Sequence, residues 1–261
     1  MESAKSNAPL HDAGPIGGLY LAEDHPVARN PHRPTEDDIL RSADLRYIAR
    51  SKRITDIVIS LGALTVFGLL LPWIALAIKL DSPGPIFFRQ SRIGIDRRRF
   101  RHADCASDGE RRSIVYPGKP FDIVKLRTMR TDAEKDGPQW AKEHDTRITR
   151  VGNFLRKTRL DEFPQFVNVL KGEMSVIGPR PERLCFIRQL EHDVPCYMDR
   201  LAVLPGITGL AQVVNGYDTD LESVRRKVAL DRQYIRSLNW KSDVRIFLMT
   251  FRVLFSGDGA H

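Results

Sequence analysis

The sequence predicts a mixed α/β, mainly helical protein attached to one side of a membrane by a re-entrant helix, and three observations predict it. An uncharged apolar run, Ile57–Ile78 (IVISLGALTVFGLLLPWIALAI), is long enough to cross a hydrocarbon core of about 30 Å. Pro72 interrupts this run, and basic residues flank it on both sides. Helical apolar spacing at Asp37–Ser51, Leu221–Leu238 and Asp243–Phe255 predicts amphipathic helices. The last of these either lies on the membrane interface or packs against the domain.

Positive charges on both sides of the apolar run favour a hairpin over a plain span. The cations are Arg50, Lys52 and Arg53 before the run, and Lys79, Arg89 and Arg92 after it. Because segments rich in Lys and Arg stay on the cytoplasmic side, both ends of the run are expected there. Pro72 lacks a backbone donor and clashes with the carbonyl group of Gly68, which kinks or breaks a helix. We therefore expect residues 51–80 to enter one leaflet, turn near Pro72 and return. A kinked spanning helix and a buried core helix are the alternatives.

The remaining sequence divides into an extension and one domain. At 261 residues the chain is long enough for a single domain with additions. Residues 1–50 are polar and rich in Pro and His, which predicts a partly disordered extension without a signal peptide. Residues 81–261 then form a cytoplasmic domain, with a basic insertion at 97–117.

Charge and cysteine content narrow the classes of partner. The net charge of +8 favours polyanionic partners, and the apolar run favours anionic lipid and phosphorylated substrates over nucleic acid. The arginine-rich insertion contains only Phe100 as an aromatic residue, so a stacking surface for nucleic acid is not expected. The three cysteines form no CxxC pair, which argues against a disulfide framework and a zinc site.

An adjacent acidic pair, Asp161-Glu162, is the strongest candidate for chemistry. Asp161 has the position of a helix N-cap, with Glu162 in the first turn and Gly172 as the expected stop. One interpretation is purely structural: Asp161 caps the helix and Glu162 complements its dipole. The competing interpretation is a reactive site, since aspartate is a competent nucleophile toward phosphorus.

Cations close to this pair favour the reactive interpretation. They are Arg156 and Arg159 just before it, Arg180 in the rigid Gly-Pro-Arg-Pro turn, and Lys125 and Arg127 at the end of the predicted strand Phe121–Leu126. Arginine binds phosphate oxygens in a bidentate manner. Paired carboxylates supply the hard oxygen ligands that Mg²⁺ requires, so Asp161 and Glu162 are also the predicted metal ligands. The chain contains no Walker A or GxGxxG motif, so a nucleotide-binding α/β domain is not expected.

A series of motifs in a fixed order makes the chain resemble a known family. The motifs are KRITDIVIS, SPGPIFFRQSRIG, FDIVKLRTM, RITRVGNFLRKTRLDEFPQFVNVLKGEMSVIGPRPE, LPGITGLAQV and DRQYI. Together they resemble the bacterial sugar transferases, the polyprenyl-phosphate hexose-1-phosphate transferases of the small monotopic phosphoglycosyl transferase superfamily. The resemblance covers approximately Lys52–Phe255.

The resemblance implies an activity and assigns roles to residues. Such enzymes move a sugar phosphate from a UDP-sugar to undecaprenyl phosphate and release UMP. By resemblance Asp161 is the nucleophile, and Glu162 assists with metal or proton handling. Lys125, Arg156 and Arg180 handle phosphate or order the site, and Mg²⁺ is the cofactor. Pro72 matches the helix break of the family's re-entrant anchor.

The resemblance also implies a place for the protein and leaves some questions open. It places the protein at the bacterial inner membrane, in contact with membrane lipid, with the catalytic domain facing the cytoplasm and starting exopolysaccharide or glycoconjugate assembly. Oligomeric state is open, with a homodimer as one interpretation, and a simple hexose is the favoured sugar. The alternative function is a non-catalytic membrane adaptor of the polysaccharide machinery. The N-terminal 50 residues and the 97–117 insertion depart from the family pattern.

Overall fold

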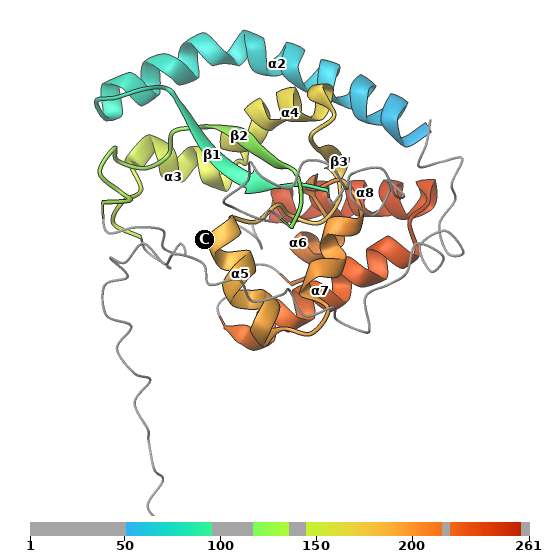
Figure 1. The fold of residues 1–261 in the computed structure, drawn as a ribbon. Helices are drawn as coiled ribbons and strands as arrows, with labels where there is room; N and C mark the ends of the chain where they lie inside the picture. Colours follow the sequence, from blue (N-terminus) through green and yellow to red (C-terminus); the bar gives the residue numbers. More distant parts are fainter. Residues whose placement is uncertain (1–50, 96–116, 136–144, 216–219, 257–261) are drawn as a thin grey trace, which may run out of the picture.

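The computed structural model describes residues 51–95, 117–135, 145–215 and 220–256, and it confirms a mixed α/β, mainly helical fold (Figure 1). The elements in order are α2 (Lys52–Asp81), β1 (Phe87–Ile93), β2 (Pro120–Leu126), α3 (Arg150–Lys157), the 3-10 helix η3 (Leu160–Gln165), α4 (Phe166–Lys171), β3 (Ser175–Ile177), α5 (Leu184–Asp193), the 3-10 helix η4 (Tyr197–Ala202), β4 (Gly206–Thr208), α6 (Leu210–Val214), α7 (Leu221–Arg236) and α8 (Trp240–Ser256). The polar extension, the predicted helix at Asp37–Ser51 and residues 96–116 of the basic insertion lie outside the described residues.

Helix α2 is continuous, so the prediction that it breaks at Pro72 is wrong. It is one helix of 30 residues with Pro72 inside it, and Figure 1 shows it as a curved helix along one side of the domain. Proline removes only one hydrogen bond of the helical ladder, and a bend relieves the clash between its ring and the preceding carbonyl group. Among the described helices, α2 alone is long and apolar enough to cross a membrane, judged by length and composition.

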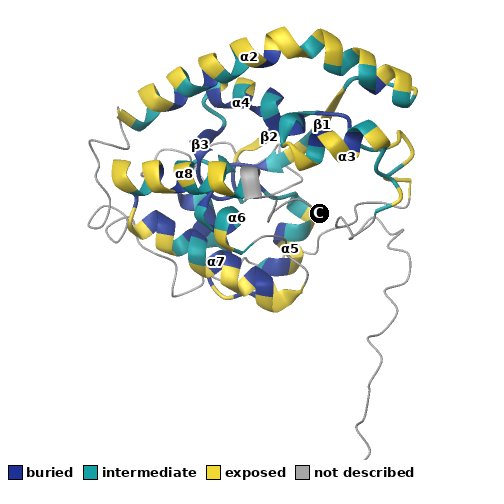
Figure 2. Cartoon of the chain, turned by 180° about the vertical axis from the view of Figure 1, so that it is seen from behind, coloured by how far each residue is buried: buried dark blue, intermediate teal, exposed yellow. Residues whose placement is uncertain are grey.

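One face of α2 contacts the domain along its length. Its buried residues are Asp56, Ser60, Phe67 and Ile78, which recur at the spacing of one helical stripe. The opposite face is exposed and apolar, with Leu69, Trp73 and Leu80 each more than 70% exposed. Figure 2 shows this exposed face pointing away from the other elements.

Polar contacts fasten both ends of α2 to the same domain. At the N-terminal end, Lys52 forms an ion pair with Asp243 of α8 at 2.6 Å. Nearby, Asp56 Oδ1 accepts hydrogen bonds from Ser175 Oγ and from the backbone N–H of Val176, both at 3.0 Å. At the C-terminal end, Asp81 Oδ2 accepts a hydrogen bond from the backbone N–H of Val151 at 2.9 Å. Because both of its ends contact the same domain, α2 lies along one side of that domain (Figure 1).

Two small sheets position the loops that carry the charged residues. β1 and β2 are antiparallel, with Phe88 opposite Lys125. β3 and β4 are parallel, with Ile177 opposite Thr208. The core packs around these sheets: Tyr234 and Ile235 of α7 join Ile246 of α8 in a buried cluster with residues of β2 and β3. A second cluster joins α5, η4 and α7.

Candidate active site

A cavity of about 470 Å³ lies where β1, β2 and η3 meet the Gly-Pro-Arg-Pro loop. Its volume is within the range of about 300–1,000 Å³ that is usual for small-molecule sites. Cations dominate its charged lining, which consists of Arg92, Lys125, Arg127, Arg130, Arg147, Arg156, Arg159, Arg180, Arg183 and Lys227, with Glu134, Asp161, Glu162 and Glu182 as the carboxylates. The predicted residues Lys125, Arg127, Arg156, Arg159, Asp161, Glu162 and Arg180 therefore all line one cavity.

Asp161 places a buried carboxyl group at the lining of this cavity. Its side chain belongs to η3, and the residue is 7% exposed. Within the described part of the chain, Asp161 Oδ1 has no hydrogen-bond partner. The predicted capping role is therefore wrong: η3 begins after Arg159, which has a left-handed φ of 57°, and the α-helix begins only at Phe166. A buried acceptor without a partner is costly, which makes it a candidate for function rather than for stability.

The surroundings of Asp161 raise the pKa of its carboxyl group to about 6. Burial is the largest cause, and the negative charge of Glu162 acts in the same direction. The positive charges of Lys125, Arg156 and Arg159 oppose the rise. The group is therefore mostly ionised at neutral pH, and it is a stronger base than an ordinary aspartate.

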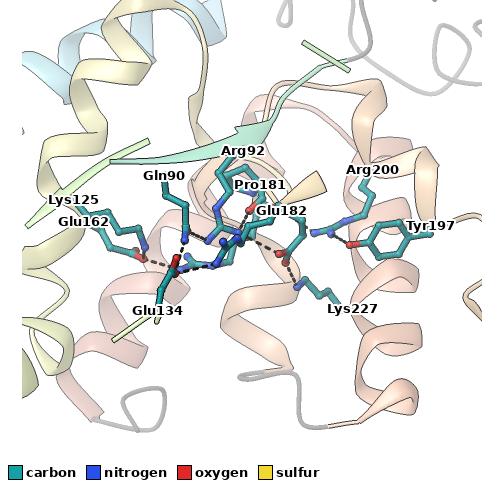
Figure 3. A network of polar contacts seen from close by, with 12 residues as sticks. Gln90, Arg92, Lys125, Glu134, Glu162, Pro181, Glu182, Tyr197, Arg200 and Lys227 are labelled. Atoms are coloured by element: carbon teal, nitrogen blue, oxygen red, sulfur yellow. Dashed lines mark hydrogen bonds and ion pairs between the residues drawn. The ribbon is translucent and has the colours of Figure 1, made fainter. Parts of the chain in front are cut away.

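The pKa of Glu162, the adjacent residue, is shifted in the opposite direction. Its Oε1 accepts a hydrogen bond from Lys125 Nζ and another from Arg180 Nη2, both at 2.9 Å (Figure 3). Burial alone raises the pKa of Glu162, but the charges of Arg180 and Lys125 outweigh it and hold the pKa far below its usual range. Glu162 is thus a permanent anion that fixes the positions of two cations beside Asp161.

The loop that carries Arg180 is fixed by backbone contacts between β3 and β4. The backbone N–H of Gly178 donates to the carbonyl oxygen of Thr208, and the backbone N–H of Gly206 donates to that of Pro179, both at 2.9 Å. A Cβ atom on Gly178 would collide with the carbonyl oxygen of Leu204, so only glycine permits this approach. The GPRP and LPGITG motifs, distant in sequence, thus build one rigid structure.

A second carboxylate network, missed by the sequence analysis, adjoins the first. Glu182 Oε1 accepts a hydrogen bond from Lys227 Nζ at 2.8 Å, and Glu182 Oε2 pairs with Arg92 at 3.3 Å (Figure 3). Although burial raises it, the charges of Lys227, Arg200 and Arg92 lower the pKa of Glu182 to about 2. The sequence signal was the glutamate that directly follows the GPRP motif, but its partner Lys227 lies on α7, far along the chain.

Arg200 connects this network to the Arg180 loop. Its Nη2 donates to the carbonyl oxygen of Arg180 at 3.0 Å, and its Nε donates to Asp231 Oδ2 at 2.9 Å. Arg200 and Asp231 are both at most 4% exposed. Their pairing secures the backbone from which the Arg180 side chain reaches Glu162.

Arg127 has a structural role in addition to its place in the cavity lining. It lines the cavity, but its guanidinium group donates to the backbone carbonyl oxygens of Ser82 and Pro83. These contacts secure the turn that follows α2, so we assign Arg127 to the structure of that turn. Arg156 and Arg159 line the cavity near Asp161, whereas Pro72 lies on the exposed face of α2 and does not line it.

The donor set is compatible with a magnesium ion that also binds a phosphorylated substrate. Among the described residues, no group of three or more His, Cys, Asp or Glu side chains is placed to hold a metal ion. Mg²⁺ often uses only one or two carboxylates and completes its shell with water and substrate phosphates. The carboxyl groups of Asp161 and Glu162, which both line the cavity, match this smaller set of hard oxygen donors.

The fold and the site define a class: an α/β protein with a long, exposed apolar helix and a cationic cavity lined by a buried acidic pair. The chain belongs to the bacterial sugar transferase family, whose profile matches residues 47–107 and 109–257. This confirms the resemblance that the sequence motifs carry.

Three curated relatives illustrate the likeness. A UDP-N-acetylgalactosamine-undecaprenyl-phosphate N-acetylgalactosaminephosphotransferase of Aeromonas hydrophila is 42% identical over 80% of this chain and 44% of its own length. A UDP-glucose:undecaprenyl-phosphate glucose-1-phosphate transferase of Escherichia coli (strain K12) is 41% identical over 76% of this chain and 39% of its own. A protein of the same description from Caulobacter vibrioides is 37% identical over 97% of this chain and 86% of its own length. The chain thus spans less than half the length of the first two relatives.

Proposed function

We propose that this protein is a phosphoglycosyl transferase that moves a hexose-1-phosphate from a UDP-sugar to undecaprenyl phosphate. One observation carries the proposal: Asp161, whose buried Oδ1 lacks a hydrogen-bond partner within the described residues, lines a cavity in which most charged side chains are cations. The names of the curated relatives, which include both glucose and N-acetylgalactosamine phosphotransferases, support the reaction type.

The first chemical step is attack by Asp161 on the phosphorus atom bonded to the sugar. A bond forms between Asp161 Oδ1 and this phosphorus, the bond to the bridging oxygen breaks, and UMP leaves with that oxygen. Because the pKa of Asp161 is about 6, the carboxylate is ionised and needs no base at neutral pH. Negative charge develops on the phosphate oxygens, and nearby cations stabilise it. These cations are Arg156, Arg159 and the two that pair with Glu162, Lys125 and Arg180.

The second step releases the sugar phosphate to the lipid. An oxygen of undecaprenyl phosphate attacks the phosphorus of the aspartyl phosphosugar, and the bond to Asp161 breaks, which restores the carboxylate. The product is an undecaprenyl-diphosphate sugar, and covalent catalysis of this kind gives ping-pong kinetics. Mg²⁺, held by Asp161 and Glu162 together with the substrate, would neutralise diphosphate charge.

The arrangement of α2 supports attachment to one leaflet instead of a crossing. Both ends of α2 contact the same domain, through Lys52 and Asp243 at one end and Asp81 at the other, and its outer face is apolar. A helix in this arrangement embeds its outer face in one leaflet and sets the cavity near the lipid headgroups. We place the protein at the bacterial inner membrane with the domain in the cytoplasm, at the start of exopolysaccharide or glycoconjugate assembly. A homodimer stays a prediction.

The test is UMP release by the purified full chain in detergent with Mg²⁺ and a panel of UDP-hexoses and UDP-N-acetylhexosamines. With one donor and no acceptor, we expect a burst of UMP that does not exceed the enzyme concentration, and steady turnover once undecaprenyl phosphate is added. Asp161→Asn should abolish both, whereas the exposed control Asp122→Asn should retain both. Absence of UMP with every donor would favour the non-catalytic adaptor.

A further inference from the structure

A second cavity, of about 300 Å³, adjoins the cationic cavity. The two share Arg159, Glu162, Arg180, Glu182 and Lys227, so these side chains form a common wall. Asp161 lines only the larger cavity, on the other side of this wall. A ligand in the second cavity therefore reaches Asp161 only with a group placed at the cationic wall.

Away from the shared wall, the second cavity has a different chemical character. Its lining is mainly aromatic and aliphatic, with Phe163 and Phe166 on one side and Phe247 and Phe251 of α8 on the other. Thr208 and Thr250 also line it, and their hydroxyl groups share a hydrogen bond of 2.8 Å. A cavity that is cationic at one wall and apolar elsewhere fits a ligand with an anionic head and a hydrocarbon chain.

The apolar part of this cavity adjoins the buried inner face of α2 and an exposed apolar stripe on α8. The ring of Phe163 lies 5.9 Å from that of Phe67 on α2 and 5.7 Å from that of Phe166. On α8, an exposed apolar stripe consists of Trp240, Val244, Leu248 and Phe251 at helical spacing. Phe251 belongs to both the stripe and the cavity lining, so the cavity borders an apolar surface of α8.

We propose that this second cavity binds the phosphate-proximal isoprene units of a polyprenyl phosphate, with the phosphate at the wall formed by Arg159, Arg180 and Lys227. The assignment rests on the proposed function and adds a separate site for the acceptor. Its volume is at the lower end of the usual range of about 300–1,000 Å³ for ligand sites, so it holds only the head end of a long chain. After UMP has left, the acceptor phosphate at this wall attacks the aspartyl phosphosugar from the side opposite the Asp161–phosphorus bond.

The decisive comparison uses two substitutions on the same stripe of α8. Phe251 and Leu248 are 44% and 63% exposed, but only Phe251 lines the cavity. Phe251→Asp should raise the KM for farnesyl phosphate about tenfold or more, since a carboxylate next to an apolar chain costs at least about 1.4 kcal/mol, which is a factor of ten. Leu248→Asp should leave this KM within about twofold of the wild-type value. Equal effects of both substitutions would overturn the proposal, because they would indicate general contact of α8 with lipid.

The acceptor-independent UMP burst separates this inference from the proposed function. If Phe251→Asp keeps the burst and loses affinity for farnesyl phosphate, the acceptor site is supported. If the wild-type protein lacks the burst, the proposed covalent function fails, and photolabelling of the wild-type protein still tests the cavity. A diazirine analogue of farnesyl phosphate should label peptides from Leu210–Val214 and Trp240–Ser256, and undecaprenyl phosphate should compete. Labelling confined to α2 would overturn the proposal.

Discussion

The cationic cavity and the contact between α2 and the domain each contain a buried aspartate, and the two aspartates differ in their hydrogen-bond partners. Asp56 is 4% exposed, and its Oδ1 accepts hydrogen bonds from Ser175 Oγ and from the backbone N–H of Val176. Asp161 is 7% exposed, and its Oδ1 has no such partner in the described structure. Both carboxylates lie near cations, Lys52 in the first case and Lys125 in the second.

We infer that this difference separates a structural carboxylate, Asp56, from the proposed reactive one, Asp161. Burial removes water from both groups, and a buried acceptor without a partner costs about 1–3 kcal/mol. At Asp56 the fold supplies hydrogen-bond donors, so the group joins α2 to β3. At Asp161 the nearby donors Lys125 and Arg180 bond to Glu162 instead, and Oδ1 has no partner among the described residues.

The largest expected effect is the loss of activity in Asp161→Asn. We expect turnover to fall by about 10³-fold or more, because loss of a catalytic nucleophile removes the covalent route. Asp56→Asn should retain most of the activity per folded molecule, since Asp56 is outside the cavity. Initial rates of UMP release, normalised to folded protein, measure both. A comparable loss in the two variants would remove the distinction between the carboxylates.

Removal of the Lys125 charge should have the next largest effect. The positive charge of Lys125 lowers the pKa of Asp161, so Lys125→Met should shift the acidic limb of the pH–rate profile upward from about 6. Loss of one cation near the phosphates should also reduce the rate by about 10- to 10³-fold. The exposed control Lys119→Met should leave the profile unchanged. An unshifted limb in Lys125→Met would contradict the electrostatic role.

Asp56→Ala should destabilise the fold without a direct effect on the chemistry. It leaves the buried Ser175 hydroxyl group and the Val176 N–H without their acceptor, at about 1–3 kcal/mol for each group. Asp56→Asn keeps one acceptor oxygen and should lose less. Thermal unfolding in detergent measures the order of the melting temperatures, and a lower value for Asp56→Asn than for Asp56→Ala would contradict this account.

Asp161→Asn should, in contrast, stabilise the fold in a manner that depends on pH. The pKa of Asp161 is higher in the folded protein than its ordinary value of 3.8, so ionisation lowers stability as pH rises from below 4 to above 6. Asparagine removes this penalty, which is on the order of 2–3 kcal/mol at neutral pH because each pKa unit corresponds to about 1.4 kcal/mol. We expect a higher melting temperature than wild type at pH 7.5 and a smaller difference at pH 5. A difference that is independent of pH would show that ionisation of Asp161 is not its cause.

Pro72→Ala should have the smallest effect. The helix already continues through Pro72, so alanine adds one backbone hydrogen bond at an exposed position and should raise the melting temperature by a few degrees at most. The acceptor-independent UMP burst should be unchanged. Cysteines introduced at Ser51 and Ser82 should label from the same side of the membrane in both proteins. Labelling from opposite sides would contradict the attachment of both helix ends to one domain.

Several elements were predictable because their signals are local. The alternating pattern of Phe121–Leu126 predicts β2, and helical spacing predicts α7 and α8 within a few residues of their observed bounds. Gly172 ends α4 in a left-handed conformation, as expected. The short elements α5, α6, β3 and β4 were not predicted, because segments of a few residues carry little periodicity and depend on their neighbours.

The sequence by itself determined the long apolar helix, the acidic pair and the cations that surround it, because residue type and close spacing are local properties. Only the tertiary structure decided that Glu162 binds Lys125 and Arg180 while Asp161 Oδ1 has no partner in the described part of the chain, since this depends on where β2 and the Arg180 loop meet. The same holds for Arg127, which turned out to secure the turn after α2, and for Lys227, which α7 brings to Glu182. Contacts between residues far apart in sequence are fixed by the packing of the whole chain, which no local pattern specifies.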